Sequence, residues 1–143
     1  MSYAIRRVRD RDLLAAALSL REEVFVAEQN VPLEADLDGL DAEAIQLVAV
    51  GPHGEVVGTC RIVMEHAEAR FGRLCVRRSA RGRGIAQSLL RAAEAEARGA
   101  GASSMALHAQ TGALELYRRA GYTATGAPFD EEGIEHQRMW REL

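Results

Sequence analysis

Arginines and glycines placed between an apolar segment and a helix-forming segment are the residues of this chain best suited to chemistry. They are Arg77, Arg78, Arg81 and Arg83, with Gly82 and Gly84. Glycines let the backbone approach a ligand closely, and the first N–H groups of a helix favour an anion. Arginine side chains add charge-assisted contacts to phosphate oxygens. The segment therefore predicts a phosphate-bearing ligand, and a pyrophosphate fits it well.

Two other glycine-containing phosphate motifs do not match this segment. A P-loop ends in Gly-Lys-Ser/Thr, and the chain contains no lysine. A dinucleotide fingerprint needs a further glycine at position 87, where this chain has Gln87. An ordinary surface loop with clustered arginines is the remaining alternative, and the strand before it and helix after it argue against that interpretation.

The same residues resemble a family signature. Residues 81–86 fit the R/Q-x-x-G-x-G/A motif of the GCN5-related N-acetyltransferases (GNAT), which lies between a strand and a helix. Residues 113–122 end in Tyr-x-x-x-Gly-Tyr and look like the second marker of that family. Segments 21–32 and 129–136 resemble the ElaA-like branch. The resemblance then covers essentially all of residues 1–143, as a single N-acetyltransferase domain.

The resemblance implies acetyl-CoA as cosubstrate and assigns residues to it. The implied cofactor-binding residues are Leu74, Cys75, Val76, Arg77, Arg81, Gly82, Arg83, Gly84, Ile85, Ala86, Gln110 and Tyr117. Backbone at a bulge in the strand ending at Val76 would polarise the acetyl carbonyl. Gln110 stands where many members have Asn. Tyr117 stands where the family often has its general acid, and the alternative is that its ring only packs and hydrogen-bonds the cofactor sulfur.

The residue that accepts the amine proton is not evident from the sequence. Glu28 and His136 are the candidate catalytic bases, and His108 is expected to be a packed side chain. The acidic segments 28–41 and 130–132 are expected to attract a cationic amine, and solvated loops are the alternative. The residues assigned to substrate on this basis are Glu28, Asp36, Asp38 and Asp130. In the ElaA-like branch a His is expected where this chain has Gln46.

Composition narrows the function classes. The chain has 143 residues, of which 48% are hydrophobic and 27% charged, and this is typical of a single globular domain. A net charge of −3 gives no reason to expect nucleic-acid binding. No apolar run is long enough to span a membrane, and no signal-peptide core is visible, so a cytoplasmic location is expected. The scattered histidines and cysteines predict no metal site.

Two cysteines leave a further question open. Cys60 and Cys75 would face each other across a hairpin that turns near residues 67–68, which would allow a disulfide. The alternative is that both are small buried side chains in a reducing compartment. Homodimers are common in the GNAT fold, and nothing in the sequence decides this.

The elements that must position these residues follow from periodicity and turn signals. Strands are expected at 3–9, 45–50, 56–64, 71–76, 105–109, 122–125 and 136–141. Helices are expected from the N-cap Asp10 to about 25, at 84–98 and at 113–120, and a helical turn is an option within 30–43. The prediction is a single-domain α/β GNAT fold. It has a mixed, mostly antiparallel sheet of six to seven strands, helices on both faces and, as the resemblance implies, a splayed central strand pair.

The function predicted is transfer of an acetyl group from acetyl-CoA directly to a primary amine, on a small molecule rather than a protein. One alternative is a non-catalytic acyl-CoA sensor or interaction module on the same fold, because Gln46 and the missing base leave the acceptor site in question. Another is an enzyme for a longer acyl chain, which depends on the pocket near Cys60, Ile62 and Leu107.

Overall fold

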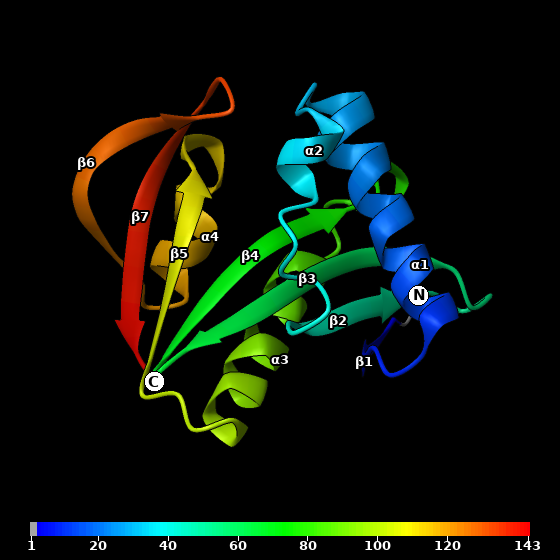
Figure 1. The fold of residues 1–143 in the computed structure, drawn as a ribbon, viewed down its shortest axis with the longest axis horizontal. Helices are drawn as coiled ribbons and strands as arrows, with labels where there is room; N and C mark the ends of the chain where they lie inside the picture. Colours follow the sequence, from blue (N-terminus) through cyan, green and yellow to red (C-terminus); the bar gives the residue numbers. More distant parts are fainter. Residues whose placement is uncertain (1–2) are drawn as a thin grey trace.

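The computed structural model describes residues 3–143 as one seven-stranded sheet of order β1-β2-β3-β4-β5-β7-β6 (Figure 1). The strands are β1 (Ala4–Arg7), β2 (Ile45–Val50), β3 (Val56–Glu65), β4 (Glu68–Val76), β5 (Ser104–Gln110), β6 (Thr123–Glu131) and β7 (Ile134–Glu142). The helices are α1 (Arg11–Arg21), α2 (Leu33–Asp36), α3 (Ile85–Gly99) and α4 (Leu114–Arg119). The π-helical segment η1 (Glu22–Glu28) extends α1, and the 3-10 turns η2 (Arg78–Ala80) and η3 (Thr111–Ala113) precede α3 and α4. Only β4 and β5 pair in parallel, so the expected mixed, mostly antiparallel sheet is confirmed.

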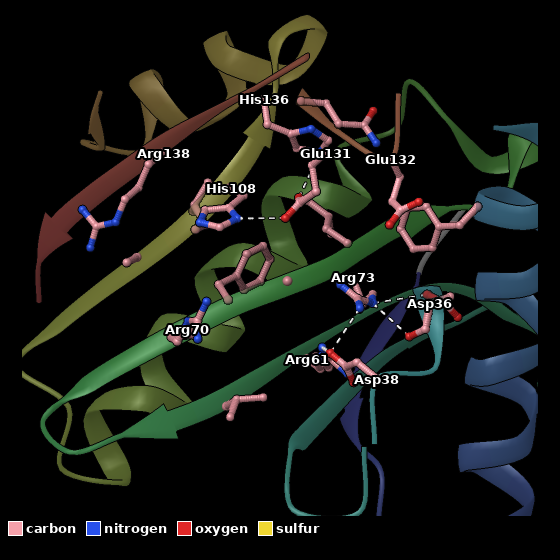
Figure 2. A pocket seen from close by; sticks show the side chains of 18 of the residues that line it. Asp36, Asp38, Arg61, Arg70, Arg73, His108, Glu131, Glu132, His136 and Arg138 are labelled. Atoms are coloured by element: carbon pink, nitrogen blue, oxygen red, sulfur yellow. Dashed lines mark hydrogen bonds and ion pairs between the residues drawn. The ribbon is translucent and has the colours of Figure 1, made fainter. Parts of the chain in front are cut away.

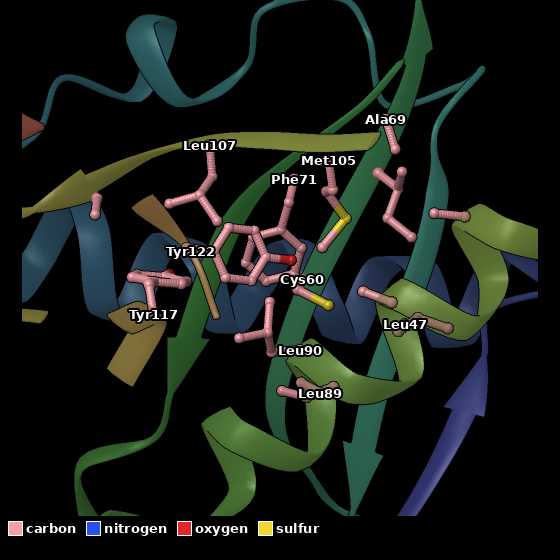
Figure 3. Packing of buried hydrophobic residues seen from close by; sticks show 14 of the residues in the cluster. Leu47, Cys60, Ala69, Phe71, Leu89, Leu90, Met105, Leu107, Tyr117 and Tyr122 are labelled. Carbon is pink, nitrogen blue, oxygen red and sulfur yellow. The ribbon is translucent and has the colours of Figure 1, made fainter. Parts of the chain in front are cut away.

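Helices cover both faces of the sheet, as predicted. On one face α3 packs across β1 to β4, and its apolar residues Ile85, Leu89, Ala93 and Ala97 are buried. Figure 3 shows Leu89 and Leu90 beside Cys60 of the sheet. The opposite face carries a smaller cluster in which α1 packs on β3 and β4. The two faces are thus covered unequally, because α1 leaves the β5–β7–β6 side of its face open.

The contact between α3 and the sheet depends on Gly58 of β3. A Cβ at this position would lie 2.9 Å from Cγ2 of Ile85 and 3.0 Å from Cδ1 of Leu89. We expect Gly58→Val to lower the free energy of unfolding by about 2 kcal/mol or more, since overpacking forces the helix away from the strand. Chemical denaturation measures the change. Gly99→Ala is the control, because a Cβ there meets no atom within 4 Å, and equal stability of Gly58→Val and the parent would contradict this packing.

A bulge in β4 changes the register of the β3–β4 hairpin. Thr59 lies opposite Cys75, whereas Arg61 lies opposite Gly72, so β4 has one extra residue between these pairs. Cys60 therefore does not face Cys75. The two side chains belong to clusters on opposite faces of the sheet, and both are free, buried thiols. The disulfide alternative is wrong, because the hairpin turns at residues 66–67, one residue earlier than expected, and the bulge shifts the pairing by one residue only.

The same bulge marks the point at which β4 and β5 separate. The two strands pair only between Glu68–Phe71 of β4 and Ser104–Leu107 of β5. Beyond Phe71 they diverge, which Figure 1 shows as the green and yellow strands spreading apart from a common point. A bulge bends its strand and increases its twist, so it accounts for the divergence. The predicted splayed strand pair is therefore present, between β4 and β5.

Candidate active site

The glycine-rich turn leads from η2 into the N-terminus of α3. Gly82 and Gly84 have φ values of +77° and +78°, and Gly84 is the N-cap of the helix. Both are left-handed conformations that suit glycine, and a Cβ at either position would meet nothing within 4 Å. The first N–H groups of a helix have no partner within it. The turn therefore presents open backbone donors at the positive end of the helix dipole.

The arginine side chains of this turn are partly engaged by acidic residues from elsewhere. Arg81 donates to both carboxylate oxygens of Glu28, over 2.7 and 2.8 Å, and to the backbone carbonyl of Val76. Arg78 lies 3.6 Å from the same carboxylate and Arg77 lies 3.4 Å from that of Glu23. Arg81 thus ties the turn to the end of η1.

The Glu28 carboxylate accepts these two hydrogen bonds and so holds the glycine-rich turn beside η1. The hydrogen bond from Arg81 lowers the pKa of Glu28, against a smaller opposing effect of desolvation. Glu28 also lies outside the wall of the cavity described below. A carboxylate with a lowered pKa is a poorer proton acceptor, so this placement favours an anchoring role for Glu28 over its expected role as base.

A cavity of about 630 Å³ occupies the gap between β4 and β5. Its wall includes Phe71 and Leu107, which belong to the core on the α3 face. It also includes Arg70 and His108, which are the neighbours of those residues along each strand and so point to the opposite face. The cavity therefore passes through the sheet where the strands part.

Tyr117 of α4 lies at the wall of this cavity on the α3 face. Its side chain is buried, with the rings of Phe71 and Tyr122 packed edge-on at centroid distances of 6.4 and 6.0 Å. Burial, with a smaller effect of Cys60, raises the pKa of Tyr117 well above its usual value. The phenol is therefore protonated at neutral pH and held in one orientation by its neighbours.

A family model described as an acetyltransferase (GNAT) domain matches residues 14–143. The chain belongs to the GNAT acetyltransferase family. UPF0039 protein Rv2851c of Mycobacterium tuberculosis is 41% identical, over 99% of this chain and 94% of that protein. The crystal structure of Escherichia coli ElaA is similar with a TM-score of 0.86 and 26% identity, over 99% of each chain. An acyl-CoA N-acyltransferase from Pseudomonas aeruginosa is similar with a TM-score of 0.83 and 30% identity, over 98% of each chain.

Family membership confirms the resemblance found in the sequence and makes this GNAT protein an acyl-CoA-dependent acetyltransferase with acetyl-CoA as cosubstrate. The geometry of its own residues fits that ligand. The open backbone donors around Gly84 suit the pyrophosphate. The edge of β4 that β5 leaves after Phe71 offers backbone groups to an extended, amide-containing arm. The Cys75 side chain is buried, so Cys75 offers its backbone rather than its thiol at this edge.

The wall of the cavity formed by the α2 loop is an ion-pair network rather than an acidic surface. Asp36 is buried and pairs with the fully buried Arg21 and with Arg73. Asp38 pairs with Arg61 and Arg73. The hydrogen bond from Arg61 lowers the pKa of Asp38, and desolvation opposes this. Arginines thus balance the charges of Asp36 and Asp38, which argues against free carboxylates at this wall, and the assignment of both residues to substrate stays a prediction.

The network also explains the unusual residue at position 46. The Gln46 amide donates to the Asp41 carboxylate over 2.9 Å, and Asp41 accepts from Arg21 and Arg61 over 2.6 and 3.1 Å. Gln46 is buried. It holds the loop against the sheet and does not lie in the cavity wall.

A second group of polar side chains forms the opposite wall of the cavity. Glu131 of β6 lies between two histidines, 3.2 Å from Nδ1 of His108 and 3.6 Å from Nε2 of His136 (Figure 2). The ring of Phe129 stacks on His136 and meets His108 edge-on. Of the acidic residues 130–132, Glu131 and Glu132 line the cavity, whereas Asp130 is outside its wall and accepts from the Gly133 N–H in the β6–β7 turn.

The predicted site residues that meet at the cavity are Leu74, Gln110, Tyr117, His136, Asp36 and Asp38, and the structure adds several that the sequence did not single out. Gln110 and His136 face each other in the β5–β7 register, and the Gln110 amide donates to Gln29 over 2.9 Å. The additions are Arg61, Arg73 and Glu131.

Within residues 3–143 no group of three or more His, Cys, Asp or Glu side chains is arranged to hold a metal ion. No helix in the same range is both long and apolar enough to cross a membrane.

Proposed function

We propose that this acetyltransferase transfers the acetyl group of acetyl-CoA directly to a primary amine of a small molecule. The observation that supports this most is the cavity through the sheet, which joins the thioester side at Tyr117 to a polar wall at Glu131 and His136. Its volume of about 630 Å³ lies within the range of small-ligand sites. A direct transfer needs both reactants in one such space, since the amine must reach the carbonyl carbon.

The proton of the attacking amine is best accepted by His136. Its Nδ1 lies 2.7 Å from the Ile134 carbonyl, an acceptor, so Nδ1 carries the hydrogen. The basic lone pair of the neutral ring is then on Nε2, which lies 3.6 Å from Glu131. Once Nε2 takes the proton, the Glu131 carboxylate stabilises the resulting imidazolium. In this proposal, Asp36 and Asp38 shape the wall that faces the acceptor.

A thiol-release assay with acetyl-CoA and a panel of small primary amines tests the function. We expect amine-dependent release of CoA, and acetyl-CoA alone should raise the melting temperature because it binds the folded state. A thermal shift without release from any amine would contradict transfer to small amines and favour an acyl-CoA sensor. No shift at all would contradict the assignment of the turn around Gly84.

Replacing His136 with glutamine is expected to lower kcat/KM for the amine by about tenfold, because a positioned base contributes at least this much and water replaces it only in part. Binding of acetyl-CoA should be unchanged, since the glycine-rich turn is on other elements. Steady-state kinetics and calorimetric titration measure the two quantities. His53→Gln, in the exposed β2–β3 turn, is the control. An unchanged kcat/KM would remove His136 from the reaction.

A further inference from the structure

The bulge of β4 has an arginine where backbone geometry favours glycine. Arg73 has a φ of +57°, in the left-handed region. Arg73 and Leu74 together lie opposite the single residue Cys60 of β3. The first residue of such a bulge is commonly glycine, and another residue there is strained. Because glycine would adopt this backbone without strain, the reason for an arginine must be found in its side chain.

The Arg73 side chain binds the loop that carries α2. Its guanidinium donates to the backbone carbonyls of Ala35 and Asp36, both over 3.3 Å. It also contacts the carboxylates of Asp36 and Asp38, both at 3.2 Å (Figure 2). Only about a quarter of the side chain is exposed, and its charge is balanced by these two aspartates. One residue thus fastens the acceptor-side wall to the point where β4 leaves β5.

We propose that Arg73 is a positioning residue for acetyl transfer, which holds the β4 bulge and the α2 loop in one arrangement around the reacting groups. This inference rests on the proposed function, since the bulge backbone is the expected donor to the acetyl carbonyl. A donor is effective only when it is aimed before the charge develops. Arg73 itself need touch neither acetyl-CoA nor the amine.

The neighbouring charges explain why the guanidinium is needed at this place. Asp36 and Asp38 are shared with Arg21 and Arg61, which come from α1 and β3. Those two arginines hold the loop to the helix and to the neighbouring strand. Arg73 alone, of the three arginines in this network, comes from the bulged segment of β4. Its loss would leave the loop attached and release the bulge.

The test compares Arg73→Gly with Arg73→Lys. Glycine keeps the positive φ and removes the contacts of the Arg73 side chain with the α2 loop. We therefore expect kcat/KM for the amine to fall about tenfold, since small displacements of groups near the reacting atoms lower the rate strongly. Acetyl-CoA affinity should fall less than kcat/KM, because the pyrophosphate turn on α3 is unchanged and only the β4 backbone contacts are loosened. Arg73→Lys keeps the positive charge but lacks the planar guanidinium with its several donors, so its kcat/KM should lie between those of Arg73→Gly and the parent. Arg7→Gly, which removes an exposed ion pair to Glu96, is the control.

Hydrogen exchange provides a readout that does not depend on turnover. Arg73→Gly should speed exchange of backbone amides in residues 72–76 more than in residues 30–44, which Arg21 and Arg61 still hold. Unchanged exchange in residues 72–76 would overturn the inference even if no amine is a substrate. If the parent transfers acetyl groups and Arg73→Gly lowers only the melting temperature, with kcat/KM retained, Arg73 is structural and the inference is wrong.

Discussion

Replacing Gly84 with valine is expected to abolish acetyl-CoA binding in a protein that still folds. Gly84 has a φ of +78° at the N-cap of α3. A residue with a Cβ costs about 1–2 kcal/mol in this left-handed conformation, and a β-branched one fits it worse. The turn would rearrange, and the N–H groups of the first turn of α3 would no longer converge. No protein atom lies within 4 Å of a Cβ built at Gly84, so the valine would project into the space that the ligand needs.

Thermal shift and calorimetric titration measure this effect. Acetyl-CoA at a hundred times its Kd should stabilise the parent by about 2.7 kcal/mol, and Gly84→Val should show no shift at the same concentration. Gly54→Val is a matched control, because Gly54 has a φ of +82° and equally open space in the β2–β3 turn. It carries the same backbone strain away from α3 and should bind normally. Parent-like affinity in Gly84→Val would show that another segment binds the pyrophosphate.

Apolar periodicity, helix caps and turn residues in the sequence were sufficient to predict most of the fold. The Asp10 N-cap is confirmed by a 2.8 Å bond from the Leu13 N–H, and β2 lies at Ile45–Val50 as predicted. The last two strands were predicted too short. β6 continues to Glu131 through an irregular pairing with β7, which includes Gly126 and Pro128 and obscures the alternation expected of a strand.

Most residues predicted to bind the cofactor are contiguous in sequence and form the turn before α3, whereas the ion-pair network at the cavity is built from distant segments. Asp36 and Asp38 read as free acids in the sequence, and only the fold brings Arg21, Arg61 and Arg73 to them. A bulge residue at positive φ gives no sequence signal when it is an arginine. Glu131 is one of three consecutive acids, and only the fold places it beside His108 and His136.

Replacing Tyr117 with phenylalanine is expected to lower kcat by about 100-fold or more, the contribution of a positioned general acid. Burial keeps the phenol protonated by raising its pKa. A CoA thiolate that leaves between apolar walls is poorly solvated, so a positioned proton donor lowers the barrier to its departure. Phenylalanine keeps the ring contacts with Phe71 and Tyr122 but has no proton to give.

Tyr122→Phe is the control that distinguishes proton donation by Tyr117 from the loss of a buried tyrosine hydroxyl in the same cluster. The Tyr122 hydroxyl donates to the buried Glu94 carboxylate over 2.8 Å, so its loss should reduce stability by about 1–3 kcal/mol and leave kcat near the parent value. Tyr117→Phe should do the opposite, with stability and acetyl-CoA affinity retained. Stopped-flow detection of thiol release, at saturating amine, distinguishes the two variants. If Tyr117→Phe turns over at the parent rate, the phenol only packs against the cofactor sulfur, and the thiolate must take its proton from water or from the amine.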